Sequence, residues 1–202
     1  SNAADRTCIG TQSGASCGAY CVAVGSSANY GGTGANTTSI GYGSGAYASG
    51  SSGAGWVAVG YQAAYHSVSA ITASNWVTIG INSGQNQTSP DWVAIGANAL
   101  RSSTARANIG TVCIGTDTTR DSSNGYGVAV GYQAGYGTVA NNRSDGDTYG
   151  IYIGYRASRD STIPAATVLS DCLAIGRSAT VSTSNTYILG SSSVGINVGI
   201  CM

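Results

Sequence analysis

The sequence lacks lysine, glutamate and phenylalanine, and it contains one histidine and two prolines. Its charged residues are eight arginines and eight aspartates, so the formal net charge is zero. Lysine and glutamate favour helices, whereas glycine, of which there are 31, disfavours them. The composition therefore predicts strands and turns and argues against long helices.

The distribution of charged and apolar residues argues against two classes of partner. The arginines are scattered singly from Arg6 to Arg177, without a basic run that could follow a phosphate backbone. No stretch approaches the roughly 20 consecutive apolar residues that a membrane helix requires. We expect neither nucleic-acid binding nor membrane insertion.

A short signature recurs eleven times along the chain. Two mostly apolar residues flank a usually small one, a glycine follows, and a Ser, Ala or Thr lies three positions after the glycine. The glycines are Gly10, Gly25, Gly41, Gly60, Gly80, Gly96, Gly115, Gly131, Gly154, Gly176 and Gly190. Short repeats of this kind are typical of solenoids, in which each coil buries its neighbours, so we expect an all-β parallel roll of about eleven coils.

The alternation within each copy predicts a strand with two different faces. Val57 and Val59 fall on one face, and Ala58 between them falls on the other. We expect the aliphatic rows to form the core of the roll and the small residues to face outward, where they would let a second chain pack closely. The glycine is expected to provide a turn with positive φ, and the small residue after it to fill a tight space.

The chain divides into three parts. Residues 1–3, Ser-Asn-Ala, resemble an expression scar, residues 4–190 carry the repeats, and residues 191–202 follow the last copy. We expect the last part to lead into a further domain of a longer protein.

Several copies of the repeat resemble those of known fibrous proteins. The segments WVAVGYQAAY at residues 56–65 and WVAIGANAL at 92–100 resemble the head repeats of trimeric autotransporter adhesins. The segment AVGYQAGY at 129–136 is similar to repeats of phage and other viral tail fibres, and YILGSSSVGI at 187–196 to the segment that precedes their self-cleaving chaperone domain. The resemblance implies a left-handed parallel β-roll, a side-by-side homotrimer and attachment to a host surface.

The resemblance therefore implies a segment of a virion tail fibre, located at the virion surface. Such a segment either contacts a host receptor, for which a glycan is one candidate, or acts as a rigid spacer. A bacterial adhesin head at the outer-membrane surface is the alternative. An ice-binding solenoid is less favoured because it needs a flat, regular array, whereas the repeat spacing here varies from 14 to 23 residues.

The reactive side chains do not form a familiar catalytic or metal-binding motif. The cysteines are Cys8, Cys17, Cys21, Cys113, Cys172 and Cys201, with no C-x-x-C pair, and the one histidine is His66. We expect no metal, no cofactor and no enzymatic activity, and we interpret the cysteines as unpaired apolar fillers. Because exported proteins tend to pair their cysteines, unpaired thiols favour a virion protein assembled in a reducing cytoplasm.

Aromatic residues offer two interpretations. Trp56, Trp76 and Trp92 take the same place in three successive copies, which predicts a ladder of indoles. The ladder would either pack the roll or provide a platform for sugar rings. The tyrosines that could join such a platform are Tyr61, Tyr65, Tyr132 and Tyr136.

Overall fold

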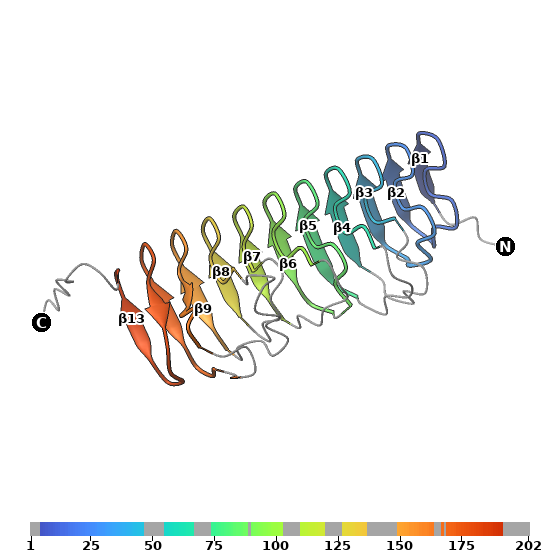
Figure 1. Cartoon of the computed structure of the whole chain (residues 1–202). Coiled ribbons are helices and arrows are strands. Elements are labelled where there is room, and N and C mark those ends of the chain that lie inside the picture. Colours follow the sequence, from blue (N-terminus) through green and yellow to red (C-terminus); the bar gives the residue numbers. More distant parts are fainter. Residues whose placement is uncertain are drawn as a thin grey trace, which may run out of the picture.

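A computed structural model gives the structure of residues 5–46, 55–66, 74–88, 90–102, 110–119, 127–136, 149–163, 167 and 169–191. Within these ranges the protein contains strands and turns and no helix. Eleven strands lie side by side in chain order and form one parallel sheet along an elongated molecule (Figure 1). None of the described segments is a helix that could cross a membrane.

Each strand of this sheet comes from one copy of the repeat and ends immediately before its glycine. The strands are β1 (Arg6–Ile9), β2 (Cys21–Val24), β3 (Thr37–Ile40), β4 (Trp56–Val59), β5 (Trp76–Ile79), β6 (Val93–Ile95), β7 (Val112–Ile114), β8 (Val128–Val130), β9 (Ile151–Ile153), β11 (Leu173–Ile175) and β13 (Tyr187–Leu189). A second, two-stranded parallel sheet is made by β10 (Ser158–Arg159) and β12 (Thr180–Val181).

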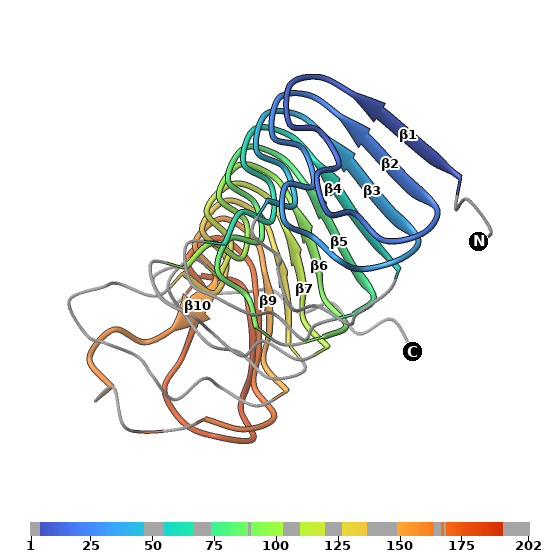
Figure 2. The same ribbon diagram turned by 90° about the vertical axis from the view of Figure 1, so that its right-hand side faces the viewer.

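Equivalent residues of successive copies stack directly on one another. Trp56 pairs with Trp76, and the next position pairs Val57 with Val77. After each strand the chain turns back, completes one coil and starts the next coil beside the one just completed. The coils are therefore stacked as a solenoid (Figure 2). The prediction of an all-β fold built as a parallel β-solenoid is confirmed.

The prediction of which strand face is buried was wrong. The small residue in the middle of the strand points into the roll, so Ala58 and Ala94 are fully buried. The flanking aliphatic residues point out, and Ile79 remains 41% exposed. The same holds along the sheet, where strand burial alternates with the small positions inside. The aliphatic rows are therefore the outer surface of the single chain.

The narrow interior of the coil explains this orientation. Ala63, the small residue after the turn, is buried in the same cluster as Ala58. The hydroxyl of Ser83, which follows β5, donates at 3.0 Å to the carbonyl of Ala94 in β6, so this close contact also joins successive coils. Small side chains fit where two backbone segments come this close, and Val or Ile in these coils would be overpacked. The predicted tight space after the turn therefore exists, and in most coils it also restricts the middle of the strand. The exception is β9, where Tyr152 occupies the middle position and is 1% exposed.

The repeat glycines form the corner at the end of each strand. All eleven have φ between 102° and 133°, a region that other residues scarcely enter. Their close stacking adds a second requirement: a Cβ on Gly60 would lie 2.5 Å from the carbonyl oxygen of Gly80 in the next coil. The predicted role of these glycines is confirmed.

The strands extend from Arg6 to Leu189, which lies inside the predicted repeat region of residues 4–190. Residues 1–3 and 192–202 lie outside the described part of the chain. The expectations of an expression scar and of a segment leading to a further domain therefore remain predictions.

Candidate functional site

The outer face of the long sheet is an aliphatic strip. It consists of the two outward positions of each strand from β2 to β11, namely Val22, Val24, Thr38, Ile40, Val57, Val59, Val77, Ile79, Val93, Ile95, Val112, Ile114, Val128, Val130, Ile151, Ile153, Leu173 and Ile175. Every one of these side chains is half-buried or exposed in the single chain. We call this set the aliphatic strip.

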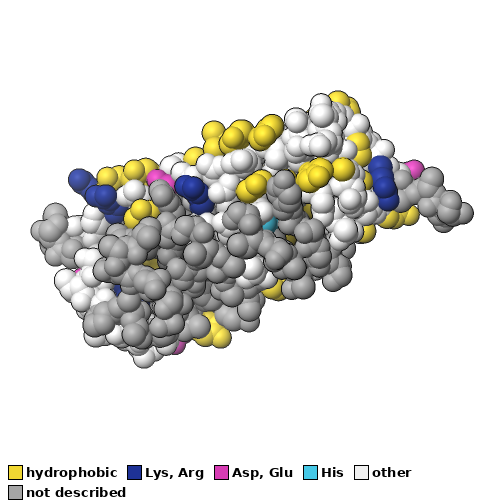
Figure 3. Space-filling view, turned by 45° about the vertical axis from the view of Figure 1, so that its right-hand side comes forward, with side chains coloured by type: hydrophobic (Ala, Val, Ile, Leu, Met, Phe, Trp, Pro, Cys, Tyr) yellow, Lys and Arg dark blue, Asp and Glu magenta, His cyan; other side chains and the backbone are white. Residues whose placement is uncertain are grey.

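The aliphatic strip contains no charged side chain, and Thr38 is its one polar member. Nine strands of the long sheet, β2 to β9 and β11, carry the strip, and at about 4.8 Å spacing they give it a length of about 40 Å. The side of the molecule drawn in Figure 3 shows apolar side chains in separate groups and few Arg and Asp side chains. Parallel sheets are usually covered on both faces, but the described residues of the roll cover only the inner one. An uncharged apolar surface of this kind is typical of interaction sites.

The three tryptophans form the predicted ladder. Trp56 and Trp76 stack with ring centroids 4.6 Å apart, and Trp76 and Trp92 follow at 5.0 Å. All three indoles lie inside the roll and are at most 2% exposed. This placement supports the packing role and leaves no indole face that a sugar could contact without opening the coil.

Exposed tyrosines lie instead at the corners that follow the repeat glycines. Tyr61 stacks on Tyr42 with ring centroids 5.5 Å apart. Tyr132 stacks on Tyr155 at 5.4 Å, and each of the four side chains is about half exposed. Tyr61 and Tyr132 were among the candidate residues, whereas Tyr42 and Tyr155 were not. Their shared position, one residue after the glycine, is the sequence signal that would have identified them.

The remaining candidate tyrosines, Tyr65 and Tyr136, are half-buried. Each lies five residues after the repeat glycine of its coil. A charged group adjoins the second exposed pair: the guanidinium carbon of Arg156 lies 5.8 Å from the ring centroid of Tyr155. Arg156 Nε donates to Gln133 Oε1 at 2.8 Å, which fixes the guanidinium beside the rings. Aromatic faces next to a fixed guanidinium suit a ring-shaped ligand that carries an acidic group.

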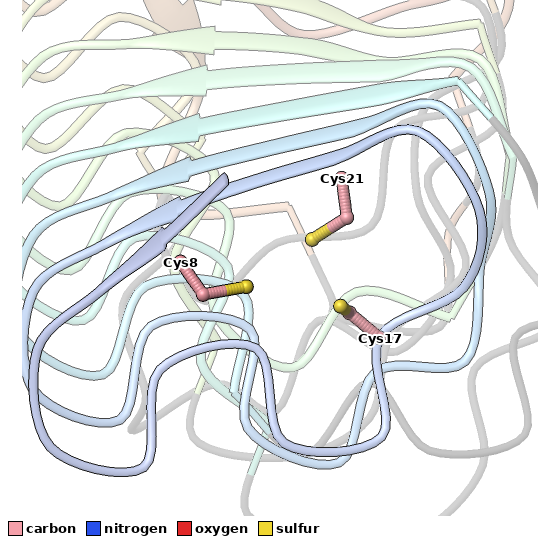
Figure 4. A group of neighbouring side chains, drawn as sticks. All are labelled: Cys8, Cys17 and Cys21. Carbon is pink, nitrogen blue, oxygen red and sulfur yellow. The ribbon is translucent and has the colours of Figure 1, made fainter. Parts of the chain in front are cut away.

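Three cysteines that the sequence places in different segments come together in the first two coils. The sulfur atoms of Cys8, Cys17 and Cys21 all lie within 4.8 Å of one another and point toward a common centre (Figure 4). Burial, followed by the contact with Cys21, raises the pKa of Cys17 to about 12, and the charge of Arg6 opposes this rise. No disulfide joins the cysteines that the structure describes. The search for C-x-x-C spacing missed this cluster because coil stacking, and not local sequence, brings the thiols together.

The single histidine is enclosed by the roll. His66 is 1% exposed, and burial lowers the pKa of its imidazole to about 3. Neither ring nitrogen has a hydrogen-bond partner among the described residues. The imidazole is therefore neutral at pH 7 and is a poor candidate for acid–base chemistry at that pH.

No protein-family model matches the chain, and neither a curated protein nor a solved structure is detectably similar to it.

Proposed function

We propose that the chain is a structural segment of a trimeric attachment fibre, in which three copies pack side by side through their aliphatic strips. The observation that carries the proposal is the uncharged, half-exposed aliphatic face of the parallel sheet. The likeness of the V-A-I-G copies to tail-fibre and adhesin repeats supports the number three and the role in attachment. The fibre belongs at a virion surface.

The geometry of the strip suits copies of the same chain aligned in parallel. Its residues are spaced by the strand repeat, so a second strip in the same direction presents matching side chains at the same interval along its length. Three sheets around a common axis would each turn the strip inward and leave the glycine corners at the periphery. The burial of half-exposed valine and isoleucine side chains would stabilise the assembly by about 25 cal/mol for each Å² removed from water.

The thiols support a virion over an exported adhesin. Cys17 and Cys21 lie close together but are not joined by a disulfide. Unpaired thiols this close are readily oxidised in an oxidising compartment and persist in a reducing one. This agrees with a protein that folds in the cytoplasm of an infected cell.

Light scattering coupled to size-exclusion chromatography tests the assembly. We expect a mass three times the 20.0 kDa of one chain. The double variant Ile79→Asp, Ile114→Asp places two carboxylates in the middle of the strip, where both side chains are about 40% exposed in the single chain. It should be monomeric while retaining the far-ultraviolet circular dichroism of a β protein, because burying unpaired charges at an interface is costly.

The matched control is Tyr132→Asp, which changes an equally exposed side chain outside the strip. This variant should remain trimeric. A wild-type chain that is monomeric or dimeric at micromolar concentration would refute the trimer, as would a double variant that assembles like the wild type.

A further inference from the structure

The thiol cluster is built from two successive coils. Cys8 comes from β1, Cys21 begins β2, and Cys17 lies in the turn between them. Cys17 and Cys21 are buried, whereas Cys8 is exposed. The cluster thus has a buried floor and an open side through which a small ion could enter.

The backbone around the cluster encloses the thiols closely. Gly14 has φ of 63°, and a Cβ on it would collide with the sulfur of Cys8 and lie 3.2 Å from the sulfur of Cys17. Glycine at this position therefore gives the two sulfurs room to converge. A larger residue would push at least one of them away from the common centre.

A buried amide orients the third thiol. Asn29 is fully buried, and its Nδ2 lies 3.2 Å from the sulfur of Cys21 and 3.0 Å from the hydroxyl oxygen of Thr37, donating to both. Donors of this kind orient ligand atoms at metal sites and stabilise the negative charge of a thiolate. Arg6, whose charge acts on Cys17, adds a positive charge near the cluster.

We propose that Cys8, Cys17 and Cys21 together bind one thiophilic d¹⁰ cation, Zn²⁺ or Cu⁺. Binding breaks three S–H bonds, releases three protons to the solvent and forms three metal–sulfur bonds, with no change of oxidation state. Zn²⁺ takes a water molecule as its fourth ligand, and Cu⁺ is held by the three sulfurs alone. Soft thiolate ligands select ions of this class over Mg²⁺ or Ca²⁺.

The sulfur positions are close to those that such an ion requires. A Zn–S bond of about 2.3 Å places the sulfurs of a tetrahedral site about 3.8 Å apart. The sulfurs here lie within 4.8 Å of one another, so a closure of no more than about 1 Å completes the site. Rotation of the exposed Cys8 side chain can supply part of this movement.

Another cysteine shows the surroundings expected of a thiol that only fills space. Cys113 occupies the same interior row as Cys8 in a central coil, but its sulfur contacts the hydroxyl of Thr119 and, among the residues that the structure describes, no second thiol. Filling space explains one thiol in that row. It does not explain three sulfurs directed at one point beside a glycine that leaves them room, whereas metal binding uses all three.

Metal titration of the full chain tests the proposal. The protein is reduced with a phosphine and stripped of metal, then titrated with Zn²⁺ against a chromophoric chelator and, without oxygen, with Cu⁺ against a Cu⁺-selective chelator. We expect one ion per chain in at least one of the two titrations. Co²⁺ in place of Zn²⁺ should give the sulfur-to-metal charge-transfer absorption of thiolate ligands.

Two variants decide whether the cluster is the site. Cys8→Ser removes an exposed thiol, so folding is expected to persist, as circular dichroism can verify, while affinity falls at least about tenfold. Cys172→Ser, which alters a buried thiol in a distant coil, should bind like the wild type.

The possible outcomes separate cleanly. Cu⁺ binding alone identifies a three-coordinate site, and Zn²⁺ binding with the charge-transfer band identifies a site with a fourth ligand. Failure of the wild type to bind either ion overturns the proposal, as does unchanged affinity in Cys8→Ser. None of these results depends on whether the chain forms a trimer.

Discussion

Trp56 and Trp76 stack inside the roll with their ring planes 9° from parallel, each on the strand beside the other. The stack continues to Trp92, so three coils share one column of indoles. Large side chains occur here because the first position of the strand lies where the coil is wide enough to hold a ring, whereas the middle position takes alanine or threonine. The column therefore fills the interior and joins successive coils.

Removal of the central indole is expected to destabilise the roll strongly. Trp76→Ala takes away a ring that contacts aromatic neighbours on both sides, so the free energy of unfolding should fall by about 3 to 5 kcal/mol. Urea denaturation followed by circular dichroism measures this change. The control Tyr61→Ala also removes a stacked ring, but an exposed one, and should cost about 1 kcal/mol. Equal losses in the two variants would contradict a structural role for the buried ladder.

Substitution of a corner glycine should be among the most damaging changes in the chain. Gly80 has φ of 133°, and a Cβ on it would lie 2.5 Å from the carbonyl oxygen of Gly96. Gly80→Ala combines backbone strain with a clash that the next coil cannot relieve, so we expect a loss of at least about 3 kcal/mol or failure to fold. Chemical denaturation, or the yield of folded protein, provides the measurement.

Gly43 is the matched control for this substitution. Its φ of 60° lies in the ordinary left-handed region, and its Cβ would meet nothing closer than 3.6 Å. Gly43→Ala should therefore cost only about 1 to 2 kcal/mol. A Gly80→Ala protein as stable as Gly43→Ala would show that the stacked corners tolerate side chains.

Most of the scaffold could be predicted from the sequence, because a repeat of known register needs few further constraints. The position of Gly60 in its copy indicated the strand end, the turn and the partner glycine in the next coil. Alternation at Val57, Ala58 and Val59 showed that the strand has two faces, but period two cannot tell which face is inside. Which face is inside depends on the width of the coil. That width is set by the distance between the strand and the backbone segment that follows the turn.

The site was harder to predict for the same reason. The proximity of Cys8 to Cys21 depends on the pairing of β1 with β2, which sets Arg6 opposite Cys21. Tyr42 is equivalent to Tyr61 in the repeat. The sequence does not show that both side chains are exposed, because that depends on which rows of the coil are buried. The pairing register of the strands brings such residues together although they are far apart in the sequence. A motif defined by spacing along the chain carries no information on that register.

The buried histidine should make stability depend on pH. The folded-state pKa of His66, about 3, is below its ordinary value of 6.5, so the unfolded chain binds a proton that the folded chain excludes. The contribution of the neutral imidazole to the free energy of unfolding is therefore complete above about pH 6.5, and it declines as the pH falls toward 3. At pH 5 the expected loss is about 2 kcal/mol relative to pH 7.

His66→Gln is the variant that isolates this effect. The eight aspartates are common to both proteins, so the difference between their pH profiles reports the histidine. Denaturant midpoints at pH 7, 6 and 5 should fall more steeply in the wild type than in His66→Gln. Parallel profiles would mean that the imidazole binds its proton equally well in the folded and the unfolded chain, so that burial does not lower its pKa.

The exposed tyrosine pairs are the surfaces on which we expect a receptor glycan to bind. Tyr132, Tyr155 and Arg156 combine aromatic surface with a guanidinium that Gln133 holds in place, a combination that favours sugars carrying a carboxylate. A glycan array probed with the folded wild type should therefore show binding to acidic glycans. The double variant Tyr132→Ala, Tyr155→Ala should weaken that binding at least about tenfold, the equivalent of about 1.4 kcal/mol.

Tyr20→Ala, which alters an exposed tyrosine away from both stacked pairs, is the control for this loss and should bind like the wild type. Arg156→Gln should reduce binding to acidic glycans more than to neutral ones, because it removes the charge but keeps a polar side chain. Since the aromatic rings and the guanidinium act on different parts of the ligand, the two losses should differ in selectivity as well as in size. A folded wild-type assembly that binds nothing on the array would contradict glycan recognition and favour a spacer role, in which the aliphatic strip alone accounts for the function of the roll.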